Sequence, residues 1–109
     1  MPPYHVVEGR IILTWGVPWP QGVLTGVEDH GGFYLEHVVA FAGTPPGTLG
    51  RVLSAGLTEA WRRGYAHVVF CVPQDHPIAS GLFALAERYG FTLYAGNAAF
   101  TWWIKRKPA

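Results

Sequence analysis

Residues 43–50 are the part of this sequence whose residue types point most directly to chemistry. They read Gly-Thr-Pro-Pro-Gly-Thr-Leu-Gly and lie between a segment of strand character and a segment of helical character. The first N–H groups of a helix that follows such a turn have no partner inside the helix, and they bind phosphate readily. The sequence therefore predicts a phosphate-binding turn, without establishing a reaction.

Two polar side chains interrupt the otherwise apolar strand that precedes this turn. Glu36 and His37 are adjacent in the segment 33–42, so in a regular strand they face opposite sides of the sheet. Glu36 is interpreted from its surroundings as an edge carboxylate paired with a neighbouring group. His37 shares its predicted face with Phe33 and Leu35, which favours a hydrogen-bonded histidine in the core.

The usage of cysteine and histidine does not indicate a metal site. Cys71 is the single cysteine, which excludes a disulfide within the chain and a cysteine-rich zinc site. Its place in an apolar segment favours the role of a small buried residue. We expect no metal, because the histidines lack the spacing of metal ligands; they are His5, His30, His37, His67 and His76.

The composition is that of one domain with few charges. A chain of 109 residues is predicted to fold as a single domain, residues 1–109. Charged residues make up 14%, against roughly 25% on average, so apolar surface is left for a partner or a homodimer, with a compact monomer as the alternative. A net charge of +1 argues against nucleic acid as a partner. The sequence shows no secretory signal and no apolar run of about 18 residues, so we expect no membrane contact and a cytoplasmic location.

Periodicity predicts the elements that position these residues. Apolar residues recur at helical spacing over residues 47–63, where Glu59 and Arg63 form an i,i+4 pair and Gly64 ends the helix. A continuous apolar run over residues 66–72 is typical of a strand buried on both faces. The other predicted elements are strands over residues 5–15 (with a turn at 8–10), 23–28 and 33–42, a helix over 77–89, and a hairpin of strands 91–95 and 98–104.

Two short motifs in this order of elements resemble those of a known family. Arg62-Arg63-Gly64-Tyr65 at the end of the first helix and Glu87-Arg88-Tyr89-Gly90-Phe91 at the end of the second resemble the GNAT acetyltransferase superfamily. The resemblance covers about two thirds of the chain, residues 33–104. It implies an α/β fold with a mixed, centrally parallel sheet flanked by two main helices, an acetyltransferase-like core that lacks the N-terminal helices.

For the turn, the resemblance implies a site for the pyrophosphate of acetyl-CoA. The family pattern is Arg/Gln-x-x-Gly-x-Gly/Ala; Gly50 matches its last position, whereas Thr48 stands at the middle glycine and Pro45 at the Arg/Gln. Pro45 and Pro46 lack N–H donors, for which the Thr48 hydroxyl is a substitute. The expected contacts to acetyl-CoA are Phe41, Ala42, Gly43, Gly47, Thr48, Leu49 and Gly50.

The resemblance also implies residues for proton transfer. Glu36 lies on the strand that supplies the general base in many members of the family, where it would take a proton from an attacking amine. His37, adjacent to it, is the alternative base. Ala86 occupies the position of the usual general-acid tyrosine, for which Tyr89 and Tyr94 are candidate substitutes. Tyr89 shows helical core spacing with Leu85, which favours a packing role for it.

Two functions follow from the resemblance. The first is transfer of an acyl group from acetyl-CoA to an amine acceptor, with Cys71 lining the pantetheine groove. The second is a binding or structural module that keeps the fold, lacks the chemistry and acts through protein contacts. Small proteins of this kind also occur among bacteriophage gene products. The sequence leaves both functions open.

Overall fold

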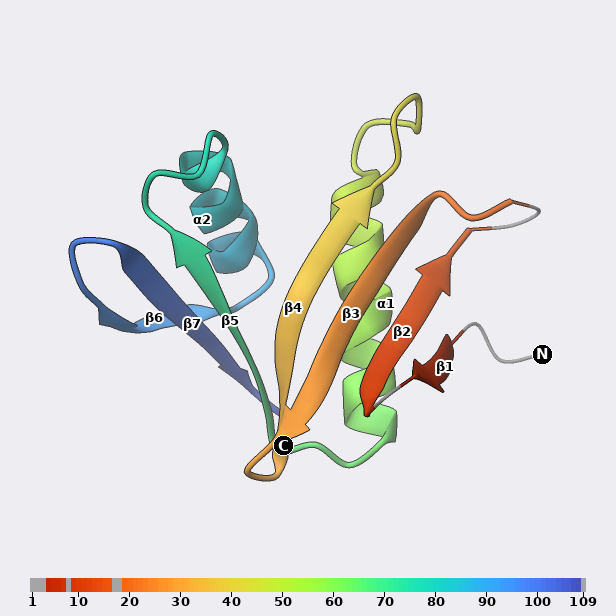
Figure 1. The fold of residues 1–109 in the computed structure, drawn as a ribbon, viewed down its shortest axis with the longest axis horizontal. Coiled ribbons are helices and arrows are strands. Elements are labelled where there is room, and N and C mark those ends of the chain that lie inside the picture. The colour runs from red at the N-terminus through yellow and green to blue at the C-terminus, as the bar shows by residue number, and fades with distance from the viewer. Residues whose placement is uncertain (1–3, 8, 17–18, 109) are drawn as a thin grey trace.

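The computed structural model describes residues 4–7, 9–16 and 19–108, with side chains for residues 9–16 and 19–108. In this part of the chain seven strands form one sheet, accompanied by two helices (Figure 1). In chain order the elements are β1 (Tyr4–Val7), β2 (Arg10–Trp15), β3 (Gly22–Asp29), β4 (Gly32–Ala40), α1 (Thr48–Arg62), β5 (His67–Pro73), α2 (Ala79–Arg88), β6 (Thr92–Gly96) and β7 (Phe100–Arg106).

The elements predicted from the sequence are present, with shifted ends. The segment 5–15 forms the β1–β2 hairpin as expected, although residue 8 in its turn lies outside the described residues. β4 ends at Ala40, so Phe41 and Ala42 belong to the following turn and not to the strand as predicted. α2 begins later than predicted, because the N–H of Ala79 donates to the carbonyl of His76 in a turn that precedes the helix.

The sheet is mixed, but most of its pairs are antiparallel. The strand order is β1-β2-β3-β4-β5-β7-β6, and β4–β5 is the one parallel pair in the described chain. The centrally parallel sheet expected from the sequence is therefore reduced to a single pair. Tight turns such as residues 30–31 join antiparallel neighbours, whereas parallel strands need a long crossover, which α1 provides between β4 and β5.

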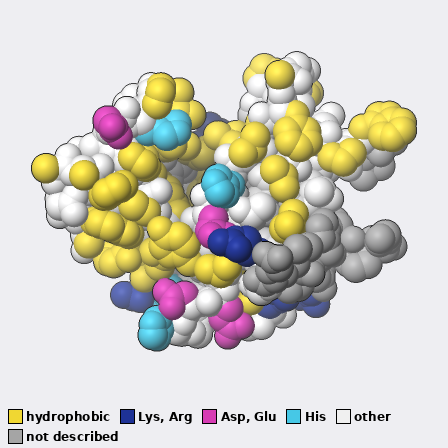
Figure 2. Space-filling view, in the orientation of Figure 1, with side chains coloured by type: hydrophobic (Ala, Val, Ile, Leu, Met, Phe, Trp, Pro, Cys, Tyr) yellow, Lys and Arg dark blue, Asp and Glu magenta, His cyan; other side chains and the backbone are white. Residues whose placement is uncertain are grey.

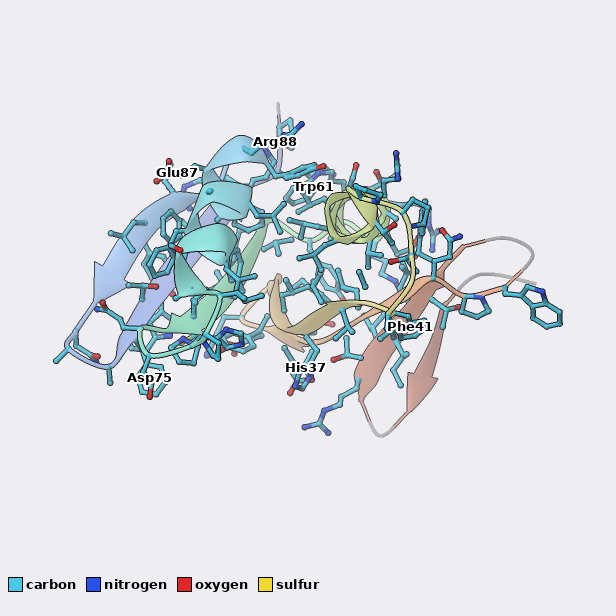
Figure 3. The ribbon with its side chains drawn as sticks, turned by 90° about the horizontal axis from the view of Figure 1, so that it is seen from above. His37, Phe41, Trp61, Asp75, Glu87 and Arg88 are labelled. Atoms are coloured by element: carbon cyan, nitrogen blue, oxygen red, sulfur yellow. The ribbon has the colours of Figure 1, made fainter. Side chains whose placement is uncertain are left out.

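Both helices pack on one face of the sheet (Figure 3). α1 covers β2, β3 and β4, and α2 lies against β5, so that one apolar core fills the space between helices and sheet. The core includes Leu24 of β3, Val52 and Leu57 of α1, Ala86 of α2 and Trp103 of β7. In the described residues no helix precedes α1, as the sequence led us to expect, and the opposite face of the sheet carries no helix.

Helix α1 forms the amphipathic element that its spacing predicts. Gly56 allows close packing on β3, because a Cβ there would collide with the side chain of Leu24. The helix ends at Arg62, and Gly64 takes the left-handed conformation with φ 83°. The N–H of Tyr65 then donates to the carbonyl of Ala60, which closes the end of the helix as predicted.

Near the end of α1, Glu59 binds two arginines, and this predicts a pH-dependent contribution to stability. Its Oε1 lies 2.6 Å from Arg62 Nη2 and 3.0 Å from Arg63 Nε, and its side chain is 14% exposed. The hydrogen bond from Arg62, followed by that from Arg63, lowers the pKa of Glu59 below its usual value. The stabilisation is therefore complete above the pKa of the unfolded carboxyl, ~4.3, and is lost as the pH falls through the lower folded value.

We expect Glu59→Gln to lower the free energy of unfolding by about 1 kcal/mol at pH 7. In urea titrations this difference should shrink as the pH is lowered from 7 to 2.5, because the wild-type carboxyl loses its charge as the pH falls through its lowered pKa. Glu87→Gln, at an exposed position of α2, is the control and should have no such effect. A Glu59→Gln deficit that is as large at pH 2.5 as at pH 7 would contradict the ion-pair explanation.

Candidate functional site

β4 and β5 pair over a short stretch and then diverge (Figure 1). Their backbone pairing joins residues 33–35 to residues 68–70 and includes no other described residue. Beyond this stretch a cleft of about 480 Å³ opens between the carboxyl-terminal halves of the two strands. Ligands of open α/β sheets commonly bind at this end of the strands, so we take this cleft as the candidate site.

β4 carries a bulge at Glu36, on the wall of the cleft. The pairing of β3 with β4 shifts next to Thr25, which lies opposite His37 and leaves Glu36 as the extra residue. The alternation of side chains therefore reverses: Leu35 and Val38 both pack toward the helices, and His37 is exposed on the other face. The prediction of a core histidine is wrong for this reason, and Figure 3 shows His37 on the side of the sheet away from the helices.

One nitrogen of the His37 ring is engaged with β3. Nδ1 lies 3.2 Å from the hydroxyl oxygen of Thr25, a contact that orients the ring. Among the hydrogen bonds between described residues none involves Nε2, and the residue lines the cleft. His37 thus presents one ring nitrogen from a fixed position.

Glu36 is held by an arginine from β2. Arg10 donates from Nε to Oε1 at 3.0 Å and from Nη2 to Oε2 at 3.4 Å. The interpretation of Glu36 as a carboxylate paired with a neighbour is therefore confirmed. Figure 2 shows acidic, basic and histidine side chains together near the centre of the uncovered face, beside a hollow.

The turn between β4 and α1 is closed by its own hydrogen bonds. The N–H and the hydroxyl of Thr44 both donate to the carbonyl of Phe41, at 3.3 and 2.8 Å. Thr48 is 2% exposed, and its N–H and hydroxyl both donate to the carbonyl of Pro45, at 3.3 and 2.6 Å. The Thr48 hydroxyl is thus used within the turn, and is not the open donor that the sequence suggested.

Other N–H groups of this turn have no backbone partner, although Gly50 is buried. No backbone hydrogen bond among the described residues is donated by the N–H of Gly47, Leu49 or Gly50. Gly43 and Gly47 adopt φ values of 82° and 85°, which glycine tolerates without strain. Because these N–H groups lie at the positive end of the α1 dipole, the turn keeps the donors that an anion needs.

Gly50 also has a packing role, which the sequence did not reveal. A Cβ at this position would collide with the hydroxyl of Tyr89 in the segment after α2. Tyr89 packs against the core and does not line the cleft, so it is the packing residue that its helical spacing favours. Gly50, the glycine that matches the last position of the cofactor pattern, therefore also makes room for Tyr89 where α1 meets the end of α2.

The opposite wall of the cleft is formed by β5 and α2. Ala86, at the position where the family usually has a tyrosine, is among the lining residues, and no described tyrosine lines the cleft. Cys71 is partly buried and lines the cleft as well, rather than lying fully in the core. Burial raises the pKa of the Cys71 thiol, so the thiol stays protonated at neutral pH.

His76 is a site residue that sequence reasoning missed. It lines the cleft from the connection between β5 and α2, and its Nδ1 accepts the N–H of Ile78 at 3.2 Å. The neutral ring therefore carries its proton on Nε2, as a donor. The signal that was available is its place just after the carboxyl end of a central strand, where ligand-binding residues gather.

Two further features bear on the kind of site. In the described part of the chain no group of three or more metal-ligating side chains comes together, and Glu36 is the one carboxylate among the residues that line the cleft. No helix of this part has the length and apolar character needed to cross a membrane. The polar groups at the cleft are instead two histidines, a thiol and an ion pair.

Comparison of the fold with solved structures gives many similar proteins. An acetyltransferase from Bacillus subtilis in complex with CoA aligns with a TM-score of 0.79 at 10% identity, over 94% of this chain and 80% of that one. A GNAT family acetyltransferase from Elizabethkingia anophelis with acetyl-CoA bound aligns with a TM-score of 0.76 at 11% identity, over 91% and 77%. The ribosomal-protein-S18-alanine N-acetyltransferase from Escherichia coli aligns with a TM-score of 0.75 at 13% identity, over 93% and 71%.

Sequence comparison adds nothing to this likeness. No protein-family model matches the chain, and no curated protein matches it. At identities of 13% or less, the three structures establish a shared fold. The alignments over more than 90% of this chain show that it has the fold of the GNAT acetyltransferases.

Proposed function

We propose that this protein binds acetyl-CoA in the cleft between β4 and β5 and transfers the acetyl group to an amine. The cleft is the observation that carries the proposal, because the pairing of the two strands ends at residues 35 and 70 and leaves room between them. Proteins of the same fold have CoA or acetyl-CoA bound. The combination of apolar walls with a few polar groups is typical of small-molecule sites.

The turn at the start of α1 is the proposed binding site for the pyrophosphate. The N–H groups of the exposed Gly47 and the partly buried Leu49, which make no backbone hydrogen bond, supply donors, and residues 41–43 flank them. Arg51 adds a positive charge, since its guanidinium reaches back to the carbonyl of Pro46 at 3.5 Å. This arginine replaces the charge that the family pattern places at the position of Pro45.

His37 is the proposed proton acceptor, in preference to Glu36. Arg10 donates a hydrogen bond to each carboxylate oxygen of Glu36, so fewer of its lone pairs are left to face an attacking amine. The Nε2 atom of His37 is open, and an imidazole accepts protons near neutral pH. Glu36 and Arg10 then act by fixing the bulge that carries His37.

The reaction balances with these groups. The amine nitrogen forms a bond to the carbonyl carbon of the thioester, the bond from that carbon to sulfur breaks, and the amine gives one proton to His37. The leaving sulfur takes up a proton and departs as CoA thiol. Ala86 contributes no acid, so this proton comes from solvent at the cleft.

A thermal-shift titration tests the binding step. Acetyl-CoA at 100 times its dissociation constant should stabilise the protein by ~2.7 kcal/mol, which raises the melting temperature by about 10 °C. Val39→Trp places a large ring at a partly exposed position on the cleft wall and should abolish the shift. Leu93→Trp, on the exposed strand β6 and outside the cleft, is the matched control and should keep the shift.

The outcomes separate the two functions suggested by the sequence. Absence of a shift at millimolar acetyl-CoA would overturn the proposal. A shift without acetylation of any amine in a broad panel would favour a binding module that keeps the fold, as the alanine at position 86 and the proline at position 45 would suggest.

A further inference from the structure

A second hollow lies on the uncovered face of the sheet. Its volume is about 240 Å³, and the buried Phe33 of β4 belongs to its lining. Its three aromatic walls that are not fully buried are Tyr34 of β4, Tyr94 of β6 and Trp102 of β7. Polar side chains close one end, at the β3–β4 turn and the start of β5: Asp29, His30 and His67. We call it the aromatic hollow.

The walls of the aromatic hollow are accessible. Figure 2 shows hydrophobic side chains gathered over the half of this face that lies on the left, and both helices lie on the other face (Figure 3). Tyr94 is 53% exposed, and Trp102 is partly buried beside Phe100, with ring centroids 5.9 Å apart. A flat ring can therefore reach these walls without displacing core residues.

The aromatic hollow and the cleft lie end to end on the same strands. Tyr34 is paired with Val69 in the parallel register, and both line the hollow. Two residues further along their strands, Glu36 and Cys71 line the cleft. Two residues of a strand span ~7 Å, so a ligand with a short aliphatic chain can reach from the hollow to the cleft.

Electrostatics also link the two spaces. Burial raises the pKa of the Tyr34 hydroxyl, and the nearby Cys71, Tyr94 and Glu36 raise it further. Tyr34 therefore keeps its phenolic proton and stays uncharged at neutral pH, between the ring walls and the bulge.

The size and lining of the aromatic hollow define what it can hold. Small-molecule sites usually measure roughly 300–1,000 Å³, so about 240 Å³ suits one part of a ligand whose remainder lies elsewhere. Three aromatic walls favour a ring, by offset or edge-to-face contacts. The Oδ1 atom of Asp29 lies 3.3 Å from His30 Nε2, and the remaining lone pairs of this carboxylate can accept a hydrogen bond from a ring that carries an O–H or N–H group.

We infer that the aromatic hollow is the acceptor site and that it takes a primary amine joined by a short chain to a hydroxyphenyl or indole ring. This inference rests on the proposed function, because the chain must deliver the amine to the thioester in the cleft. The ring lies between Tyr34, Tyr94 and Trp102, and its polar edge faces Asp29. The amine then lies next to the bulge, within reach of His37.

Binding of amines to the protein without acetyl-CoA tests the site by itself. Tyramine and tryptamine are the probes, phenethylamine lacks the polar group on the ring, and n-butylamine lacks the ring. By isothermal titration calorimetry we expect tyramine and tryptamine to bind about tenfold more tightly than n-butylamine.

Tyr94→Ala should weaken the binding of both ring amines about fivefold, because an aromatic contact contributes ~0.5–1.5 kcal/mol. Trp19→Ala removes an exposed aromatic residue of the β2–β3 loop and should change nothing.

Asp29→Asn tests the orientation of the ring. It should weaken tyramine and tryptamine severalfold and leave phenethylamine unchanged, since only the first two donate from the ring. Equal losses for all three amines would contradict the assigned orientation.

Acetylation assays with the same amines separate this inference from the proposed function. Tight binding of the ring amines without acetylation would overturn the proposed function and keep the site. Equal acetylation of n-butylamine and tyramine, unaffected by Tyr94→Ala, would overturn the inference and keep the proposed function. Absence of both binding and acetylation would overturn both.

Discussion

Replacement of His37 by alanine is expected to lower kcat for acetyl transfer by about 100-fold or more, because a positioned proton acceptor contributes ~10²–10⁴-fold. The KM for acetyl-CoA should change little, since the imidazole acts on the amine. Glu36→Gln should cost less than about tenfold, because the pair it forms with Arg10 is partly exposed and such pairs contribute at most ~1 kcal/mol. Steady-state kinetics with each variant measures both effects.

The pH dependence distinguishes a proton acceptor from a residue that only shapes the bulge. An imidazole must be neutral to accept a proton, so the wild-type rate should fall as the pH is lowered. The His37→Ala variant should lose this acid limb while its acetyl-CoA thermal shift remains. If Glu36→Gln is the more damaging change and removes the acid limb instead, the carboxylate is the base and our assignment is wrong.

The largest expected effect on stability comes from Trp103. Its ring is 5% exposed and stacks on Phe83, with centroids 5.6 Å apart, and its Nε1–H donates to the hydroxyl of Thr101 at 3.1 Å. Trp103→Ala removes the side chain that joins β7 to α2 and should lower the free energy of unfolding by about 3–5 kcal/mol. Urea denaturation followed by circular dichroism measures this loss.

A matched tryptophan provides the control for that prediction. Trp19 is 78% exposed, and Trp19→Ala should stay within about 0.5 kcal/mol of the wild type. If Trp103→Ala is too unstable to isolate, Trp103→Phe keeps a ring and loses the hydrogen bond, and should cost about 1–2 kcal/mol. Similar stabilities for Trp103→Ala and Trp19→Ala would contradict the packing described for β7 and α2.

Local patterns were sufficient to predict most of the elements. The helix over residues 47–63 was predicted because apolar residues recur at its spacing and Gly64 follows it. The parallel pairing of β4 with β5 could be predicted because the helix between them is long enough to cross over the sheet. The prediction of a parallel centre was too broad, because the pairing of β7 with β5 depends on contacts distant in the sequence.

The chemistry of the site was harder to predict, for reasons of geometry. Nothing in the segment 33–42 marks Glu36 as an extra residue, so regular alternation placed His37 in the core. The hydroxyl of Thr48 could be predicted as a donor, but its acceptor, the carbonyl of Pro45, depends on the fold of the turn. The motif that ends at Phe91 assigned Ala86 to the usual position of the general-acid tyrosine, and the structure shows that Ala86 lines the cleft.

The aromatic hollow could not be predicted from the sequence at all. Tyr34, Tyr94 and Trp102 belong to three different strands. They come together because β7 lies between β5 and β6, an order that the hairpin pattern of the last segment leaves undetermined. Only the assembled sheet brings their rings to one place.

The parallel pairing between β4 and β5 is short, and it divides the sheet into two parts, which we call panels. Three residue pairs link the panel of β1–β4 with α1 to the panel of β5–β7 with α2. A molecule seated in the cleft touches both panels at once, since Leu53 of α1 and Leu82 of α2 both line it. A ligand bound there would therefore stabilise the contact between the two panels, which few backbone pairs hold together, and its affinity would depend on how rigidly the panels are held.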